Sequence, residues 1–159
     1  MTNARTKLLP LILILPLAGC VSGPKPAATA DADAQIRQRL KQIFDAAEKK
    51  NFERLESYHL YGPGFSKFSA ESSTRLDAAA ARKGERDGLQ ALSGLTMKAE
   101  DLKIDVFDKT GIATFIFDYG FKAGTNTVQK QAQATLVFVK DAGEWKITHE
   151  HFSPSKASQ

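Results

Sequence analysis

Between residues 34 and 50, apolar residues recur at intervals of three or four positions: Ile36, Leu40, Ile43 and Ala47. Charged side chains fill most of the remaining positions. This period places the apolar side chains along one side of a helix. The pattern therefore predicts a helix over 34–50, with Asp31 or Asp33 as the residue that caps its first turn.

The next part of the chain predicts further helical segments. Phe52 and Leu55 suggest a short helix, and the glycines and proline of 61–64 then require a turn. From 75 to 94 the helical period returns. Gly84 and Gly88 lie inside this segment, and because glycine disfavours helix interiors we expect an interrupted helix there.

After Met97 the period changes to two. Leu102, Ile104 and Val106 alternate with polar residues, as is typical of a strand with one buried face. A strand over 112–121 places five residues on one face: Ala113, Phe115, Phe117, Tyr119 and Phe121. Further strands are predicted over 128–140 and 144–152, joined by short turns. Helices followed by a closely connected meander indicate an α+β fold, with N-terminal helices packed on one face of an antiparallel sheet.

The first nineteen residues have the organisation of a bacterial signal peptide. Arg5 and Lys7 precede an apolar stretch over 8–17, which is shorter than the about 20 residues that a membrane-spanning helix needs. The following Leu17-Ala18-Gly19-Cys20 resembles the lipobox of bacterial lipoproteins, which implies removal of residues 1–19 and acylation of Cys20, the only cysteine. The alternative is an ordinary secretory signal that ends beside a cysteine by chance.

This leader predicts a protein that is anchored to a membrane of the bacterial cell envelope through lipidated Cys20. Val21, in place of an aspartate, favours the outer membrane, with the domain facing the periplasm. Residues 20–33 are expected to form a flexible tether, 34–154 one folded domain, and 155–159 a disordered tail. Without the leader the chain has 20 basic and 18 acidic residues, so its charge gives no indication of a nucleic-acid partner.

The C-terminal residues carry a resemblance to a known family. Residues 135–140, a glycine turn and the segment from Trp145 to Ser153 are similar to the closing hairpin of SnoaL-like proteins, which belong to the NTF2-like superfamily. The segment from His59 to Phe68 is also similar to one branch of that family. The resemblance spans about 34–154. It implies an NTF2-like cone, in which a curved sheet wraps around the helices and encloses a pocket, and a homodimer formed through the outer sheet face.

The candidate chemistry centres on histidine. In a regular strand, His149 and His151 lie on the same side as Trp145 and Ile147. If that side faces the cone, both imidazoles are candidates for catalysis or ligand binding; otherwise they make buried structural hydrogen bonds. With His59 they could also hold a metal, but we expect no metal and no cofactor.

Aromatic side chains near the turn after the second helix are the other pocket candidates. The resemblance places this turn at the mouth of the cone, and the predicted ligand-pocket residues are Tyr58, His59, Tyr61, Phe65 and Trp145. Phe115, Phe117 and Tyr119 are expected in the core or at a sheet interface. Asp118 points away from Tyr119, and Glu150 is expected to be solvated, so no carboxylate is predicted to be buried.

These observations favour a lipid-anchored periplasmic domain that binds a small apolar or amphipathic ligand, or a protein partner. One alternative is an isomerase, dehydratase or hydrolase that uses His149 and His151 in the cone pocket. Another is a non-catalytic dimerisation or assembly domain. Because this superfamily contains enzymes, binding domains and assembly domains, the resemblance alone does not choose among them.

Overall fold

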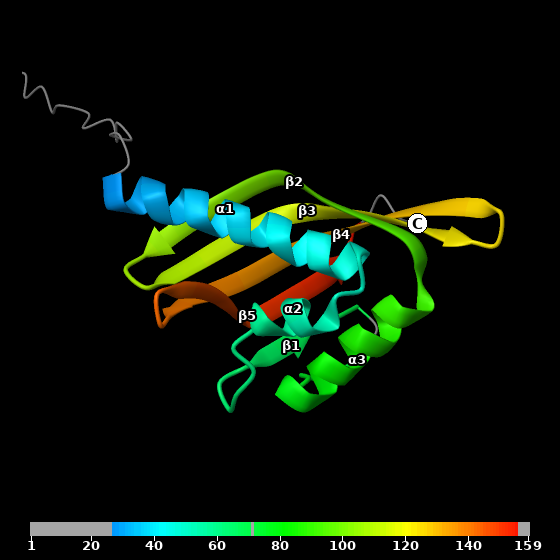
Figure 1. Cartoon of the computed structure of the whole chain (residues 1–159), viewed down its shortest axis with the longest axis horizontal. Coiled ribbons are helices and arrows are strands. Elements are labelled where there is room, and N and C mark those ends of the chain that lie inside the picture. Colours follow the sequence, from blue (N-terminus) through cyan, green and yellow to red (C-terminus); the bar gives the residue numbers. More distant parts are fainter. Residues whose placement is uncertain (1–26, 71, 156–159) are drawn as a thin grey trace, which may run out of the picture.

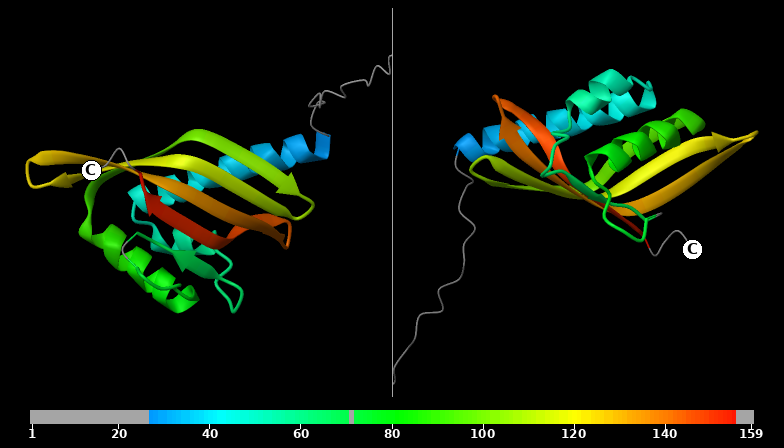
Figure 2. Two further views of the ribbon diagram at one scale, coloured as in Figure 1. Left: turned by 180° about the vertical axis from the view of Figure 1, so that it is seen from behind. Right: turned by 90° about the horizontal axis from the view of Figure 1, so that it is seen from below.

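The computed structural model describes residues 27–70 and 72–155. Three helices and five strands follow one another along the chain: α1 (Ala27–Glu48), α2 (Phe52–Ser57), β1 (Ser66–Phe68), α3 (Ala78–Ala91), β2 (Ser93–Phe107), β3 (Thr110–Ala123), β4 (Asn126–Asp141) and β5 (Glu144–Pro154). The helices lie on one side of a curved sheet (Figures 1 and 2). The predicted α+β fold is therefore confirmed. The predictions for the leader, for Cys20 and for residues 156–159 lie outside the described residues.

The sheet has the order β1-β5-β4-β3-β2. Its antiparallel part, from β2 to β5, is the predicted meander. The prediction of four strands was incomplete, because β1 adds a fifth strand that runs parallel to β5. Only three residues long and with two polar members, β1 has no alternation that the sequence could reveal.

The first helix begins at Ala27, seven residues before the predicted start at 34, so residues 27–33 are not part of a flexible tether. Alanine occupies four of the seven positions 27–33 and has the highest helix propensity. Asp31 and Asp33 accept hydrogen bonds from Gln35 and Arg37, one turn further along, at 2.8 and 2.6 Å. Both aspartates therefore lie inside the helix and do not cap it.

The core lies between α1 and the concave face of the sheet. Ile36 and Leu40 of α1 are buried against Phe138 and Ile147 of the sheet. Gly111 of β3 allows the close approach of α1, because a Cβ atom there would lie 2.3 Å from Ile36 Cδ1. Within the parts of the chain that the structure describes, no helix is both long and apolar enough to cross a membrane.

Candidate functional site

A cavity of about 630 Å³ lies between the concave sheet, α1 and α3. Most of its lining is apolar, and six aromatic side chains contribute to it: Phe44, Phe115, Phe117, Tyr119, Phe121 and Phe152. The rings of Phe44 and Phe152 each lie 5.6 Å from that of Phe117. The stripe of aromatic residues predicted on one face of β3 therefore lines a cavity instead of only filling the core.

The α3 side of the cavity is open because two of its residues lack side chains. Gly84 and Gly88, one turn apart, both line the cavity, and a Cβ atom at either position would meet nothing within 4 Å. The helix continues through both glycines, so the predicted interruption was wrong. Each glycine costs the helix about 1 kcal/mol relative to alanine. The missing side chains leave space between the helix and the sheet.

A β-bulge in β5 decides which side chains of this strand face the cavity. Val137 of β4 pairs with His149, but its neighbour Phe138 pairs with Ile147, so Thr148 is an extra residue. Such an insertion reverses the alternation of the side chains. Trp145 and Ile147 face inward before it, and Glu150 and Phe152 face inward after it.

The prediction that His149 and His151 share a face with Trp145 was therefore wrong. Neither histidine lines the cavity. His149 Nδ1 lies 2.8 Å from Ser66 Oγ, and the ring of His151 lies 5.8 Å from that of Phe68, on the outer face of the sheet. Catalysis in the cone pocket by these two residues is thus not supported by their positions.

The bulge instead brings the carboxylate of Glu150 to the floor of the cavity, where the residue is only 3% exposed. The expectation that Glu150 is solvated was wrong. The parallel pairing of β1 with β5 places Lys67 directly beside it, with 2.6 Å between Lys67 Nζ and Glu150 Oε2. The ion pair therefore depends on two features of tertiary structure, the bulge and the short parallel strand.

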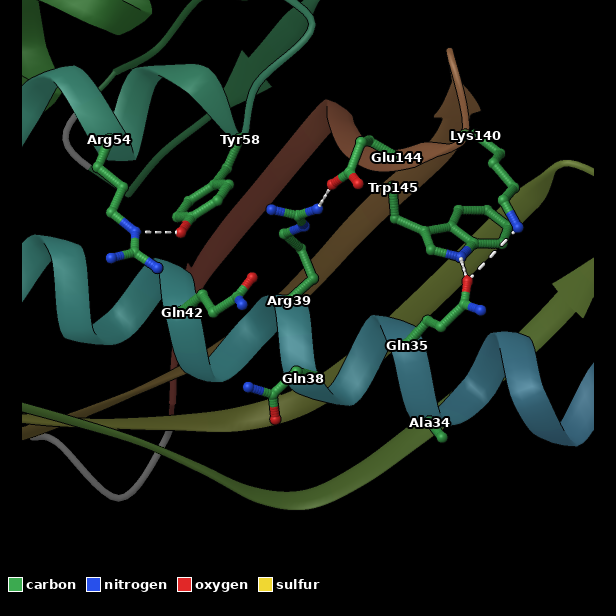
Figure 3. Close-up of a pocket in the computed structure, with 11 residues that line it drawn as sticks. Ala34, Gln35, Gln38, Arg39, Gln42, Arg54, Tyr58, Lys140, Glu144 and Trp145 are labelled. Atoms are coloured by element: carbon green, nitrogen blue, oxygen red, sulfur yellow. Dashed lines mark hydrogen bonds and ion pairs between the residues drawn. The ribbon is translucent and has the colours of Figure 1, made fainter.

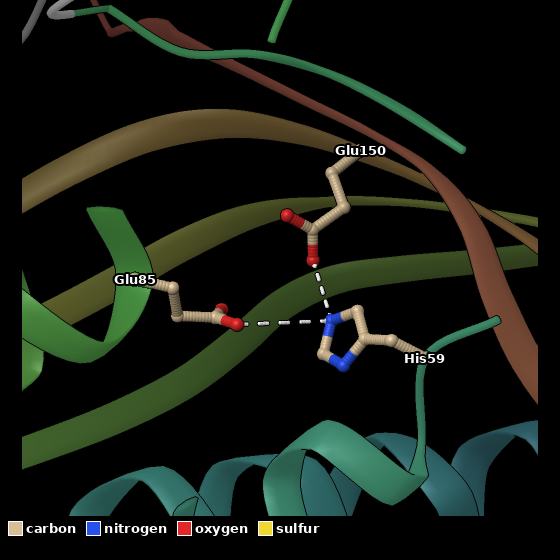
Figure 4. Close-up of side chains that lie close together, drawn as sticks. All are labelled: His59, Glu85 and Glu150. Atoms are coloured by element: carbon tan, nitrogen blue, oxygen red, sulfur yellow. Dashed lines mark hydrogen bonds and ion pairs between the residues drawn. The ribbon is translucent and has the colours of Figure 1, made fainter. Parts of the chain in front are cut away.

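His59 and Glu85 complete the polar cluster (Figure 4). His59 Nε2 lies 3.0 Å from Glu150 Oε1, and its Nδ1 lies 2.9 Å from the backbone oxygen of Leu55. Glu85 approaches from α3: its Oε2 accepts a hydrogen bond of 3.1 Å from the Tyr61 hydroxyl, and its Oε1 lies 3.8 Å from Lys67 Nζ. We call His59, Lys67, Glu85 and Glu150 the floor cluster.

The hydrogen bonds of His59 indicate its charge. Both ring nitrogens face acceptors, a backbone carbonyl and the Glu150 carboxylate, so both must carry a proton. Burial by itself lowers the pKa of His59, but the hydrogen bond and the charge of Glu150, with the charge of Glu85, outweigh it and raise the pKa. The hydrogen-bond geometry and the raised pKa therefore both favour the cationic form of the buried imidazole.

The two carboxylates differ in their proton affinity. Burial would raise the pKa of Glu150, but the charge of Lys67 and the hydrogen bond from His59 lower it to about 2. Burial raises the pKa of Glu85, and the negative charge of Glu150 adds to this effect, while Lys67 and His59 offset it only in part. Glu85 is thus the carboxylate of the cluster that takes up a proton first as the pH falls.

Three of these residues have the donor types of a metal site. One ligand atom each from His59, Glu85 and Glu150 lie within 4.8 Å of one another. The Lys67 ammonium, however, already pairs with both carboxylates, and the His59 nitrogen that faces them carries a proton. Metal binding would require deprotonation of the histidine and displacement of the lysine. We therefore interpret the floor cluster as an ion-pair network.

The predicted ligand-pocket residues do not lie in one place. His59 and Tyr61 stack with 4.9 Å between their ring centroids beneath the floor of the cavity, and Phe65 packs against Tyr61. Tyr58 and Trp145 instead line a separate polar cleft of about 640 Å³ between α1, α2 and the turn that joins β4 to β5 (Figure 3). Trp145 donates a hydrogen bond to Gln35 there, at 3.0 Å.

Comparison with known proteins identifies the fold family. The profile of the SnoaL-like domain matches residues 36–156. The chain belongs to the SnoaL-like family. Solved structures support this assignment at the level of the fold. A proposed dehydratase of the NTF2-like family from Streptomyces avermitilis superposes on this SnoaL-like domain with a TM-score of 0.73 at 18% sequence identity. The match covers 80% of this chain and 99% of the other.

Two further structures show how varied the proteins with this fold are. An NTF2-like superfamily protein from Salmonella enterica has a TM-score of 0.70 at 15% identity, covering 81% of this chain and 95% of its own. The CaMKII hub homology domain of Chlamydomonas reinhardtii has a TM-score of 0.67 at 19% identity, covering 79% and 99%. No curated protein matches the SnoaL-like chain in sequence. At these identities the likeness establishes the fold and not the activity.

The residues that sequence reasoning missed are Lys67, Glu85 and Glu150. Each is a charged residue outside any regular alternation that predicts burial, so none carries a local signal of burial. The one available signal was the unusual pair of glycines that flank Glu85 on α3, which could have indicated a helix face left open for a ligand.

Proposed function

We propose that this SnoaL-like domain binds a small, largely apolar molecule that has one polar end. The observation that carries the proposal is the cavity of about 630 Å³, with aromatic walls and charged groups gathered at one place on its floor. Binding sites for small molecules typically have this construction, in which apolar walls provide affinity and a few polar groups fix the orientation.

The proposal is tested with an uncharged environment-sensitive dye, N-phenyl-1-naphthylamine, and a variant that fills the cavity. Gly88→Leu places a side chain where the structure has open space, and it also raises the helix propensity of α3. We expect the variant to fold normally and to bind the dye at least about tenfold more weakly, a difference of about 1.4 kcal/mol.

Gln90→Leu is the matched control, because it adds the same apolar side chain to an exposed position of the same helix, outside the cavity lining. Dye affinity should be unchanged in this variant. Equal weakening in both variants, or equal affinity in wild type and Gly88→Leu, would contradict binding in the cavity.

We further propose that Cys20 anchors the domain to a membrane of the bacterial cell envelope, facing the periplasm. The lipobox-like Leu17-Ala18-Gly19-Cys20 supports this location. Because α1 begins at Ala27, six residues separate Cys20 from the helix, and six residues reach about 20 Å at most. The tether would therefore hold the N-terminal end of α1 near the membrane surface.

The anchor is tested by expression in a Gram-negative host with an alkyne-bearing fatty acid. The wild-type protein should incorporate the label, whereas Cys20→Ser should remain unlabelled. An unlabelled wild-type protein would refute the lipoprotein assignment, whatever the result of the dye experiment.

A further inference from the structure

Among the described residues, one carboxylate oxygen of the floor cluster accepts no hydrogen bond. Both oxygens of Glu150 are engaged, one by His59 and one by Lys67, and Oε2 of Glu85 accepts from Tyr61. For Glu85 Oε1, the nearest cation among the described residues is Lys67 Nζ at 3.8 Å, beyond hydrogen-bond distance.

This oxygen is accessible from the cavity. Glu85 lines it, and 18% of its side chain is exposed. Among the described residues, no buried side-chain nitrogen or oxygen lacks a hydrogen-bond partner, so Glu85 Oε1 is not enclosed. A ligand in the cavity therefore meets an unused hydrogen-bond acceptor, while the other carboxylate oxygens of the floor are already engaged.

The charges of the cluster limit the kind of donor that fits. Lys67 and the doubly protonated His59 contribute two positive charges, and Glu85 and Glu150 contribute two negative charges. The charges of these four residues sum to zero in this state. An ammonium group on the ligand would add an unbalanced positive charge beside the Lys67 ammonium, which lies 3.8 Å from Glu85 Oε1. A carboxylate group on the ligand would add an unbalanced negative charge. In an apolar cavity either charge is costly.

We propose that the polar end of the ligand is an uncharged hydroxyl group, which donates its proton in a hydrogen bond to Glu85 Oε1. The apolar body of the ligand packs among the rings of Phe44, Phe117 and Phe152. This inference rests on the proposed ligand-binding function, and it names the chemical class of ligand that the cavity takes.

Three naphthalenes of similar size, each competing with the dye, test whether the cavity prefers a hydrogen-bond donor, an acceptor or an anion. The protein is the full-length chain with Cys20→Ser, which carries no acyl chain. 2-Naphthol donates a hydrogen bond, 2-methoxynaphthalene only accepts one, and 2-naphthoate is an anion. We expect 2-naphthol to bind about tenfold more tightly than 2-methoxynaphthalene, as a hydrogen bond to a charged acceptor allows. 2-Naphthoate should bind most weakly of the three.

Glu85→Gln gives the decisive comparison, because it removes one negative charge and leaves the floor with a net positive charge. We expect 2-naphthoate to bind at least about tenfold more tightly to this variant than to wild type, and the advantage of 2-naphthol over 2-methoxynaphthalene to fall to about threefold or less. Asp87→Asn is the control: it makes the same change of charge on α3, at an exposed residue paired with Lys83, and should leave the ranking of the three ligands unchanged.

The outcomes separate this inference from the proposed function. Equal affinity for 2-naphthol and 2-methoxynaphthalene, with the dye still sensitive to Gly88→Leu, would overturn the hydroxyl assignment and leave apolar ligand binding intact. Failure of every compound to displace the dye, with no effect of Gly88→Leu, would overturn both. If Glu85→Gln does not fold, the ranking of the three ligands in wild type still decides the inference.

Discussion

Replacing Lys67 by methionine tests whether the floor cluster is an ion-pair network that stabilises the fold. The substitution preserves much of the apolar stem but removes the ammonium group that lies 2.6 Å from Glu150 Oε2. The side chains of Lys67 and Glu150 are only 13% and 4% exposed, so solvent screens their interaction weakly. After the change, Glu85 and Glu150 share a single cation, His59.

The expected loss of stability follows from that uncompensated charge. Removing one partner of a buried ion pair costs about 3–5 kcal/mol, and we expect the lower end, about 3 kcal/mol, because Glu85 borders the open cavity. For a domain of this size that corresponds to a decrease in Tm of about 10 °C. Urea denaturation followed by the fluorescence of Trp145, the only tryptophan and 2% exposed, measures the free energy of unfolding.

Two further variants sharpen the test. Lys83→Met removes a lysine whose ion pair with Asp87 is exposed on α3, and its Tm should equal that of wild type. The double variant Lys67→Met/Glu85→Gln restores neutrality, since His59 then balances Glu150, and should be more stable than Lys67→Met alone. A loss below about 1 kcal/mol in Lys67→Met, the usual value for a surface pair, or a double variant less stable than the single one, would refute the network.

Four other predictions concern pH, packing and metals. Because the pKa of Glu150 is lowered to about 2 in the folded protein, its carboxylate contributes about 3 kcal/mol to the free energy of unfolding, and this contribution should be lost as the pH decreases from about 4.5 to 2. Circular dichroism should therefore show a flatter acid limb in Glu150→Gln. The raised pKa of His59 acts in the opposite direction: its contribution is complete below pH 6.5 and is lost as the pH rises through the folded pKa, so His59→Gln should be less pH-dependent above neutrality. Gly111→Ala should lower the free energy of unfolding by about 1–3 kcal/mol, because its Cβ would lie 2.3 Å from Ile36 Cδ1, and Ile36→Val, which lacks that atom, should recover part of the loss; a fully stable single variant would contradict the close approach. Neither zinc nor EDTA should change the Tm of wild type, and a rise with zinc in calorimetry would reverse our interpretation of the cluster.

Much of the fold follows from local patterns. The helical period around Ile36 and Leu40 predicted α1, and alternation predicted the antiparallel strands and the shared face of Phe115, Phe117 and Tyr119. These predictions succeed because the side-chain periods of a helix and of a regular strand are fixed by the backbone itself. They fail at the ends, as at Ala27, where intrinsic propensity extends a helix beyond its buried face.

The site depended on tertiary structure. His59, Lys67, Glu85 and Glu150 come from four separate segments, and their meeting depends on the parallel pairing of β1 with β5 and on the bulge at Thr148. A bulge exists only relative to a partner strand, so the sequence of β5 read by itself placed His149 and His151 inward and Glu150 outward. The sequence by itself determined which elements form and which of their faces are apolar, because those are local properties of the chain. The pairing of strands far apart in the sequence determined which charged groups lie in the cavity.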